Sequence, residues 1–400
     1  MRVLMLSWEY PPHTVGGLGK HVVELLPALS ACGVEVILVT PRWLGGERRE
    51  RVAEGITIVR ADVPSRVENF SFFANTRRAN ELLRQAAEDE IDRLGGVDVI
   101  HAHDWLVGFA ATDLKHEYKL PLLVTIHATE WGRSHGSLGS DTQRSVHNAE
   151  WQLTFEAWRV ITASGYMANE VMAIFQTPHD KIDVIPNGVD TSKFDALAGA
   201  DLSALRARFA LPSERIVFSV GRLVHEKGFQ VLVDAAPYVL NAVPDAKFVL
   251  AGTGPTSPDL QRRAVENGLG AKFYFAGFVT DDVRDGLLRL ADVAVFPSLY
   301  EPFGIVALEA MAAKAPVVAT SVGGLAEVVR HNETGLTVYP DDPKSLAWGI
   351  QQALQYPYWA RRRVQNAYEM VVAEYNWHSI AQRTQNVYER LVRERAAAGW

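Results

Sequence analysis

The chain has 400 residues, of which 48% are hydrophobic and 22% are charged, as in a globular protein with room for two or three domains. The formal net charge of −7 and the pI near 6.0 argue against nucleic acid as a partner. Cys32 is the only cysteine, which excludes an intramolecular disulfide and a cysteine-rich zinc module, and because no apolar run approaches the roughly 18 residues of a membrane helix, we expect a cytoplasmic protein without a transmembrane segment.

Short apolar strands alternate with amphipathic helices in the first half of the chain, a pattern that predicts a parallel α/β domain. A helix is expected over residues 18–31, with Gly33 as its C-terminal stop. Residues 128–148 are rich in Gly, Ser and His without periodicity, which predicts a long loop that is either functional or disordered. The expected strands of this half lie at residues 3–7, 35–40, 97–101, 120–126, 160–164 and 181–186.

The same pattern restarts after Asn187-Gly188, a strong turn signal. Helices are expected from Phe229 and Gly304, and the last 40 or so residues are helical, with apolar side chains at helical spacing from Trp377 to Leu391. We predict two doubly wound domains joined near residues 186–190. The expected strands of the second domain lie at residues 216–220, 247–251, 273–276, 293–296 and 317–320.

A glycine-rich segment, Gly16-Gly17-Leu18-Gly19-Lys20, joins the first strand to the first helix. Glycines let the backbone approach a phosphate, and a helix N-terminus offers free N–H groups to it. The segment is no P-loop, because Thr14 stands at the position of the first glycine and His21 follows Lys20. The spacing of a dinucleotide fingerprint is also absent. Phosphate binding and a tight turn remain equal alternatives here.

Two further polar segments follow predicted strands, where ligands bind in open α/β sheets. The first is 101–105, whose alternating histidines His101 and His103 point the same way and suggest either a metal pair or a polar wall. Because the sequence has no second cluster with the spacing of metal ligands, the polar wall is favoured. The second is 125–133, where His127 opens the polar loop and Trp131 can stack on a sugar ring or simply pack.

The strongest set lies in the second half. Arg222 and Lys227 follow its first strand and can offset the charge of a diphosphate. Glu301 precedes a helix that begins near Gly304, whose N–H groups can face the same phosphates. Glu309 lies further along that helix, seven residues intervening between the two glutamates.

The two glutamates resemble the E-x7-E motif of the retaining glycosyltransferases of family 4. Further segments similar to that family are 184–190, 252–254, 297–298 and 320–324. The resemblance implies the GT-B fold, in which two Rossmann-like doubly wound domains face each other across a cleft. It implies an N-terminal acceptor domain at 1–186, a C-terminal nucleotide-sugar domain at 187–375, and a helix at 376–400 that returns to the first domain.

The resemblance also implies roles for particular residues. Arg222 and Lys227 would lie on the donor diphosphate, Glu301 on the transferred sugar and His127 beside the reaction centre; these four are the candidate catalytic residues. Glu309 would bind the ribose. The candidate donor-binding residues are Gly16, Gly17, Gly254, Phe303, Gly304, Ile305 and Glu309.

The first domain resembles glycogen and starch synthases, in residues 8–12, 16–18 and 101–105. Those bacterial synthases carry a lysine where Thr14 stands and a cysteine where Phe303 stands, and they lack the second glutamate. We therefore expect family 4 machinery with a glucan-type acceptor domain, and ADP- or UDP-glucose as donor. Asp104, Trp105, Glu130, Trp131 and Arg133 are the candidate acceptor wall.

The absence of an Asp-any-Asp triplet leads us to expect no catalytic metal and no cofactor. The alternatives are a lipid-linked, polyol or sugar-phosphate acceptor, a sugar-nucleotide epimerase, and a non-catalytic protein that binds sugar nucleotides. The partners expected are therefore a nucleotide-sugar and a carbohydrate. The sequence does not indicate an oligomeric state.

Overall fold

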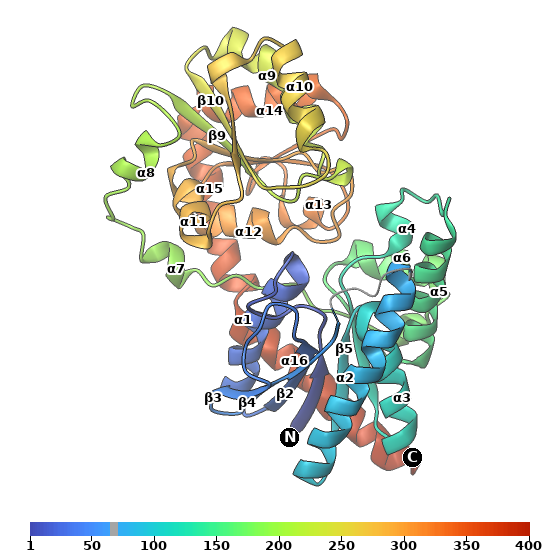
Figure 1. Ribbon diagram of the computed structural model, residues 1–400. Helices are drawn as coiled ribbons and strands as arrows, with labels where there is room; N and C mark the ends of the chain where they lie inside the picture. Colours follow the sequence, from blue (N-terminus) through green and yellow to red (C-terminus); the bar gives the residue numbers. More distant parts are fainter. Residues whose placement is uncertain (65–70) are drawn as a thin grey trace. The chain divides into compact units, whose positions relative to one another are not determined.

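The computed structural model describes residues 1–64 and 71–400, which form two compact units (Figure 1). Unit 1 comprises Met1–Gly188 and Trp377–Trp400, and unit 2 comprises Val189–Asn376. The chain therefore passes from one unit to the other twice, after Gly188 and after Asn376. Backbone N–H of Val189 donates to the carbonyl of Tyr375 at 2.9 Å, so the two crossing segments run side by side.

Unit 1 contains a sheet with the strand order β3-β4-β2-β1-β5-β6-β7-β8. All neighbouring strands are parallel except β3, which runs antiparallel to β4. The central strands are buried on both faces, as in parallel sheets covered by helices on each side. The strands are β1 (Arg2–Leu6), β2 (Glu35–Pro41), β3 (Arg49–Ala53), β4 (Ile56–Ala61), β5 (Val99–His103), β6 (Leu122–Ile126), β7 (Arg159–Thr162) and β8 (Ile182–Val184).

Two apolar cores cover the faces of this sheet, because successive side chains of a strand point to opposite sides. Leu4 and Leu6 of β1 lie in the core beneath α2, α3, α5 and α6, whereas Val3 and Met5 lie in the core beneath α1 and α16 (Figure 1). The helices are α1 (Gly17–Ala31), α2 (Phe72–Leu94), η1 (Trp105–Val107), α3 (Gly108–Tyr118), α4 (Glu130–Arg133), α5 (Asp141–Glu156), α6 (Gly165–Phe175), η2 (His179–Lys181) and α16 (Trp377–Ala398).

The C-terminal helix α16 is an integral part of unit 1. Tyr388 is fully buried, and its hydroxyl lies 2.7 Å from Nδ1 of His101 on β5. Arg390 contacts both carboxylate oxygens of Asp183 at 2.6 Å. The ring of Trp377 occupies the space that a Cβ on Gly188 would need, at 2.7 Å.

Unit 2 contains a fully parallel sheet with the order β11-β10-β9-β12-β13-β14. Numbered within the unit, this is the order 3-2-1-4-5-6 of nucleotide-binding doubly wound folds. Helices α9, α10 and α14 cover one face and share its apolar core. The strands are β9 (Arg215–Val220), β10 (Ala246–Ala251), β11 (Phe273–Gly277), β12 (Val293–Phe296), β13 (Val317–Thr320) and β14 (Leu336–Val338).

The helices of unit 2 complete its chain. They are α7 (Ser192–Asp195), α8 (Ser203–Ala207), η3 (His225–Lys227), α9 (Phe229–Ala242), α10 (Ser257–Glu266), η4 (Gly270–Lys272), α11 (Asp281–Leu290), α12 (Ile305–Ala312), α13 (Leu325–Val328), α14 (Pro343–Gln355) and α15 (Pro357–Glu374). The strands expected at 293–296 and 317–320 agree to the residue with β12 and β13.

One expectation for unit 1 was wrong. The stretch 128–148 is largely helical: it contains α4 and the first half of α5. Ser140 accepts a hydrogen bond from backbone N–H of Gln143, whose side chain caps Ser140 in return. This capping box is a sequence signal for a helix start, but the polar character of the helix hides its periodicity.

Candidate functional site

Each sheet has a point at which the strand order reverses, and ligands of open α/β folds bind beside the carboxyl ends of the strands there. In unit 1 this point lies between β1 and β5, and in unit 2 between β9 and β12. The glycine loop follows β1, His103 is the last residue of β5, and Arg222 and Glu301 follow β9 and β12. The candidate residues of each unit therefore gather at the switch point of that unit.

In unit 2 the structure brings two predicted residues into direct contact. Nζ of Lys227 lies 2.6 Å from Oε2 of Glu301, and both side chains are partly exposed. The hydroxyl of Ser298 donates to the same carboxylate oxygen at 3.3 Å. The charged pair connects the turn after β9 to the loop after β12, and it holds a cation and a carboxylate at the strand ends.

Close backbone contacts fix this arrangement. Gly228 has a φ of +67°, and a Cβ there would lie 1.9 Å from the carbonyl oxygen of Pro297. A Cβ on Gly254 would lie 2.2 Å from the carbonyl oxygen of Leu223. Only glycine fits at these two positions, so the glycine assigned to the donor, Gly254, also has a packing role.

Arg222 extends from the same loop with half of its side chain exposed. Its nearest ion-pair partner is Glu226, at 3.9 Å. A guanidinium in this setting is available to an anionic ligand, because little desolvation or pairing holds it elsewhere.

Helix α12 begins at the loop that carries Glu301. Gly304 is its N-cap, with a φ of +106°, and Ile305 is its first residue. Phe303 is buried near Tyr375, with 6.1 Å between ring centroids. Since the first turn of a helix leaves backbone N–H groups without intrahelical partners, this end of α12 suits an anion.

Glu309 lies inside α12 and is 1% exposed. Its Oε1 is 3.4 Å from Nη2 of Arg284 and 3.6 Å from Nζ of Lys193. The sequence analysis did not foresee either cation. A ribose diol would therefore meet a carboxylate already held by two positive charges.

In unit 1 the glycine loop is held by a carboxylate that the sequence analysis did not select. Oε2 of Glu9 accepts hydrogen bonds from backbone N–H of Val15 at 2.8 Å and of Gly16 at 3.0 Å. A Cβ on Gly19 would lie 2.8 Å from the same oxygen. Gly16 and Gly17 themselves are exposed at the start of α1. The loop is thus fixed from one side and open on the other.

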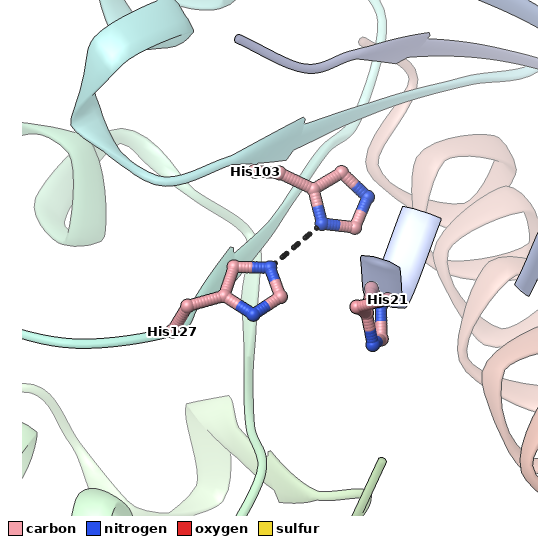
Figure 2. A group of neighbouring side chains, drawn as sticks. All are labelled: His21, His103 and His127. Carbon is pink, nitrogen blue, oxygen red and sulfur yellow. Dashed lines mark hydrogen bonds between the residues drawn. The ribbon is translucent and has the colours of Figure 1, made fainter. Parts of the chain in front are cut away.

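Four histidines gather at the switch point of unit 1. His21 comes from α1, His101 and His103 from β5, and His127 from the end of β6. Figure 2 shows His103 and His127 facing each other, with His21 beside them; Nδ1 of His103 lies 3.0 Å from Nε2 of His127. Burial lowers the pKa of His21 and of His127 to about 3, so both rings are neutral at ordinary pH.

The ring of His101 lies 4.3 Å from that of His103, centroid to centroid, but both of its nitrogens bond to other residues. Its Nδ1 lies 2.7 Å from the hydroxyl of Tyr388 and its Nε2 lies 2.8 Å from Oγ1 of Thr125. Both ring nitrogens are therefore engaged, which disfavours the metal pair of His101 and His103. The group of three histidines that could ligate one ion is His21, His103 and His127 instead.

Asp104 positions His127. Its carboxylate accepts a hydrogen bond from the backbone N–H of His127 at 2.7 Å, and its own φ is +61°. Burial raises the pKa of Asp104 to about 6, although Arg133 and the backbone bond oppose that shift. Asp104 thus anchors the start of the loop after β6.

Trp105 is a correction to the expected acceptor wall. It is 4% exposed, and its ring stacks on Phe73 of α2 with 5.6 Å between centroids. The ring lies in the apolar core beneath α2, because burying its large apolar surface stabilises the folded state. Trp131, by contrast, is 37% exposed beside His147.

Glu130 and Arg133 belong to the short helix α4, which rests on a buried carboxylate. Both oxygens of Glu150 accept the backbone N–H of Glu130 at 3.0 Å. Nη1 of Arg133 lies 3.6 Å from Glu130 and 3.9 Å from Glu150. Burial raises the pKa of Glu150 to about 8. Glu150 was not predicted from the sequence, because a glutamate in a polar helix carries no local signal of burial.

No helix among residues 1–64 and 71–400 is both long and apolar enough to span a membrane.

Comparison with known proteins agrees with these observations. Residues 15–193 match the family described as Glycosyltransferase Family 4, and residues 204–370 match Glycosyl transferases group 1. An uncharacterized glycosyltransferase of Methanocaldococcus jannaschii is 39% identical over 97% of this chain and 98% of its own length. The chain therefore belongs to the family 4 glycosyltransferases of GT-B fold.

Two named enzymes are also similar along nearly the whole chain. Glycogen synthase of Mycobacterium tuberculosis is 35% identical over 97% of this chain and 94% of its own length. The structure of sucrose-phosphate synthase from Thermosynechococcus elongatus superposes with a TM-score of 0.82, at 27% identity, over 98% of both chains. These similarities show that the protein is a glycosyltransferase of the GT-B type.

Proposed function

We propose that this protein transfers a hexose, glucose first among them, from a nucleoside-diphosphate sugar to a hydroxyl of an α-glucan, with retention at the anomeric carbon. One observation carries the donor half of the proposal: the Lys227–Glu301 ion pair at the switch point of unit 2, three residues before the N-cap of α12. This group offers positive charge and N–H donors to a diphosphate, and a carboxylate to sugar hydroxyls.

The reaction requires little from the protein beyond placement and charge. The bond between the anomeric carbon and the diphosphate oxygen breaks, a bond from that carbon to the acceptor oxygen forms on the same face, and the acceptor proton passes to the departing diphosphate. Lys227, Arg222 and the start of α12 stabilise the charge that develops on the leaving group. No enzyme nucleophile takes part.

The residues of unit 1 serve the acceptor and the sugar in this proposal. His127 is neutral and held by Asp104, so its ring can exchange hydrogen bonds with sugar hydroxyls. Trp131 offers a partly exposed aromatic face, on which the apolar face of a sugar can stack. Glu130 and Arg133 provide polar groups on the same short helix.

The likeness to glycogen synthase supports an α-glucan acceptor and a glucose donor. The likeness to sucrose-phosphate synthase favours a second candidate, a small sugar phosphate as acceptor. Both candidates share the same donor chemistry, and they differ only in the group that receives the sugar.

The test offers ADP-glucose, UDP-glucose and GDP-mannose against maltoheptaose, glycogen, glucose 1-phosphate, fructose 6-phosphate and a polyprenyl-linked sugar. Release of nucleotide diphosphate and the mass of the product are measured, and the anomeric configuration is assigned by NMR. We expect glucose on maltoheptaose or glycogen in an α-linkage.

Transfer to the sugar phosphates alone would establish the second candidate. Transfer to the lipid alone, or from GDP-mannose alone, would overturn the glucan proposal and leave a family 4 transferase. An altered donor without release of nucleotide diphosphate would indicate an epimerase. Donor binding without turnover under any pairing would indicate a binding protein.

A further inference from the structure

The three histidines His21, His103 and His127 form a compact group within unit 1 (Figure 2). One ring nitrogen of each lies within 4.8 Å of the corresponding atoms of the other two. The ring centroid of His21 is 5.3 Å from that of His103 and 4.9 Å from that of His127. Three imidazoles thus converge from α1, β5 and the end of β6.

The ring of His21 is prepared to donate a lone pair. Its Nδ1 lies 2.5 Å from Oδ1 of Asn187; since an amide oxygen only accepts, Nδ1 carries the proton. Its Nε2 is buried and has no hydrogen-bond partner among the described residues. A carbonyl oxygen that fixes the tautomer through the other ring nitrogen is the usual support of a metal-binding histidine.

One further ring of the group, that of His103, has a nitrogen without a partner in the part of the chain that the structure describes. Nε2 of His103 is buried and, within residues 1–64 and 71–400, also has no hydrogen-bond partner. A buried polar atom without a partner costs about 1–3 kcal/mol, and an ion bound to the three rings would satisfy Nε2 of His21.

From these contacts we propose that His21, His103 and His127 bind one divalent transition-metal ion of the zinc type. Three imidazole nitrogens and one water complete the tetrahedral shell that Zn²⁺ prefers. On binding, the ion replaces the hydrogen bond between His103 and His127. Both nitrogens of that bond then donate lone pairs, and the proton between them moves to the second nitrogen of the ring that carried it.

The consequence for catalysis is inhibition, and this part rests on the proposed function. His127 is assigned there to the sugar of the donor. A metal ion on its Nε2 removes that ring from hydrogen bonding and places positive charge and a bound water beside it. We therefore expect Zn²⁺ to compete with the donor, while transfer itself proceeds without metal.

Binding is measured first, without donor or acceptor. The full-length protein is treated with EDTA, desalted and titrated with Co²⁺, and the visible absorption is recorded. Tetrahedral Co²⁺ absorbs strongly, whereas hydrated octahedral Co²⁺ is faint. We expect one intense band set that saturates at one Co²⁺ per chain and is bleached by Zn²⁺.

Three variants connect the signal to the group. His21→Gln and His103→Gln each remove a ligand and should abolish the tetrahedral spectrum. Asn187→Ala removes the support of His21 and should weaken Co²⁺ affinity about 10- to 100-fold. His101→Gln is the matched control: it is a buried histidine on the same strand, outside the three ligands, and should keep the spectrum.

Tryptophan fluorescence and circular dichroism check that each variant is folded. If His103→Gln does not fold, His21→Gln and Asn187→Ala decide the question. A faint octahedral spectrum in the unaltered protein would overturn the proposal, and so would an unchanged spectrum in His21→Gln. If the protein binds Co²⁺ as expected but transfers no sugar, the proposed function fails and the metal site stands.

Discussion

Lys227 and Glu301 hold each other in place before any ligand arrives. Their charged atoms lie 2.6 Å apart, and Ser298 donates to the same carboxylate. Under the proposed function, a diphosphate at Lys227 would pair with part of its charge and leave Glu301 free to accept sugar hydroxyls. Because the ion pair fixes both side chains in advance, little reorganisation is needed when charge develops on the leaving group.

Replacing either cation near the presumed diphosphate should reduce turnover. For Lys227→Ala and Arg222→Ala we expect kcat to fall about 100- to 1000-fold, because one preorganised charge stabiliser typically contributes about 3–4 kcal/mol to the transition state. Steady-state kinetics with saturating donor and acceptor measure the effect.

Arg262→Ala provides the matched control, since Arg262 is an exposed arginine on α10 of the same unit. The thermal midpoints of all three variants should stay close to that of the unaltered protein. Near-normal kcat in both Lys227→Ala and Arg222→Ala would remove these residues from the donor site.

The shifted pKa of Glu150 makes the stability of unit 1 depend on pH. Its pKa is about 8 in the folded protein, raised first by burial, against an ordinary value of 4.5. Between pH 4.5 and about 8, the folded state therefore keeps a proton on Glu150 that the unfolded chain has already lost. Stability must fall as the pH rises through that range, because the unfolded state binds fewer protons.

Glu150→Gln should flatten this fall. Glutamine keeps an oxygen for the N–H of Glu130 and cannot ionise, so we expect the variant to gain stability over the unaltered protein as the pH rises from 5 to 8, on the order of a few kcal/mol.

Urea unfolding followed by tryptophan fluorescence measures the effect in unit 1, because only Trp348 and Trp359 of the ten tryptophans lie in unit 2. Glu81→Gln, which changes an exposed glutamate of the same unit, is the control and should leave the pH dependence unchanged. Parallel pH profiles of the Glu150 variant and the unaltered protein would contradict the assignment.

At the scale of elements, α16 supplies part of the core of unit 1. Leu391 is fully buried among residues of α1, β1 and β2, and Tyr388 lies beside it in the same core. Leu391→Ala should lower the free energy of unfolding by about 2–5 kcal/mol, through lost apolar burial and the cavity that remains.

Arg393 lies two residues further on the same helix, with 71% of its side chain exposed. Arg393→Ala should therefore change the free energy of unfolding little. Urea titration of both variants tests the contrast. Equal stability of the two variants would show that α16 does not complete the core in solution.

At the scale of the whole molecule, the proposed function has the protein's own charges balance the diphosphate without a metal. Arg222, Lys227 and the first turn of α12 are the groups assigned to it. Transfer should therefore survive excess EDTA at an undiminished rate. Complete loss of activity on chelation, restored by Mn²⁺ or Mg²⁺, would contradict the metal-free reaction; a rate that rises with EDTA would agree with an inhibitory ion on the three histidines.

The sequence by itself predicted the architecture because its signals are local. Apolar strands such as 293–296 alternate with amphipathic helices, and that alternation allows few folds other than parallel α/β. The spacing of Glu301 and Glu309 resembles the E-x7-E motif of the family, and Arg222 and Lys227 follow a predicted strand as the family's pattern requires.

What only the tertiary structure decided depends on contacts between residues far apart in the chain. The sequence shows Trp105 and Trp131 as equivalent aromatics, and only packing against α2 buries the first and leaves the second partly exposed. In the sequence, Glu9 and Glu150 do not differ from ordinary surface glutamates. In the structure, their carboxylates accept hydrogen bonds from backbone N–H groups.

The histidines show the same division. The sequence offered His101 and His103 as neighbours on one strand, which is a local relation. The fold keeps these two rings 4.3 Å apart, brings His21 and His127 from two other elements beside His103, and bonds His101 to Tyr388, 287 residues away. Local periodicity determines which elements form. Which side chains are buried, and which residues contact one another, depends on the spatial order of the strands in each sheet, and no local window of sequence contains that order.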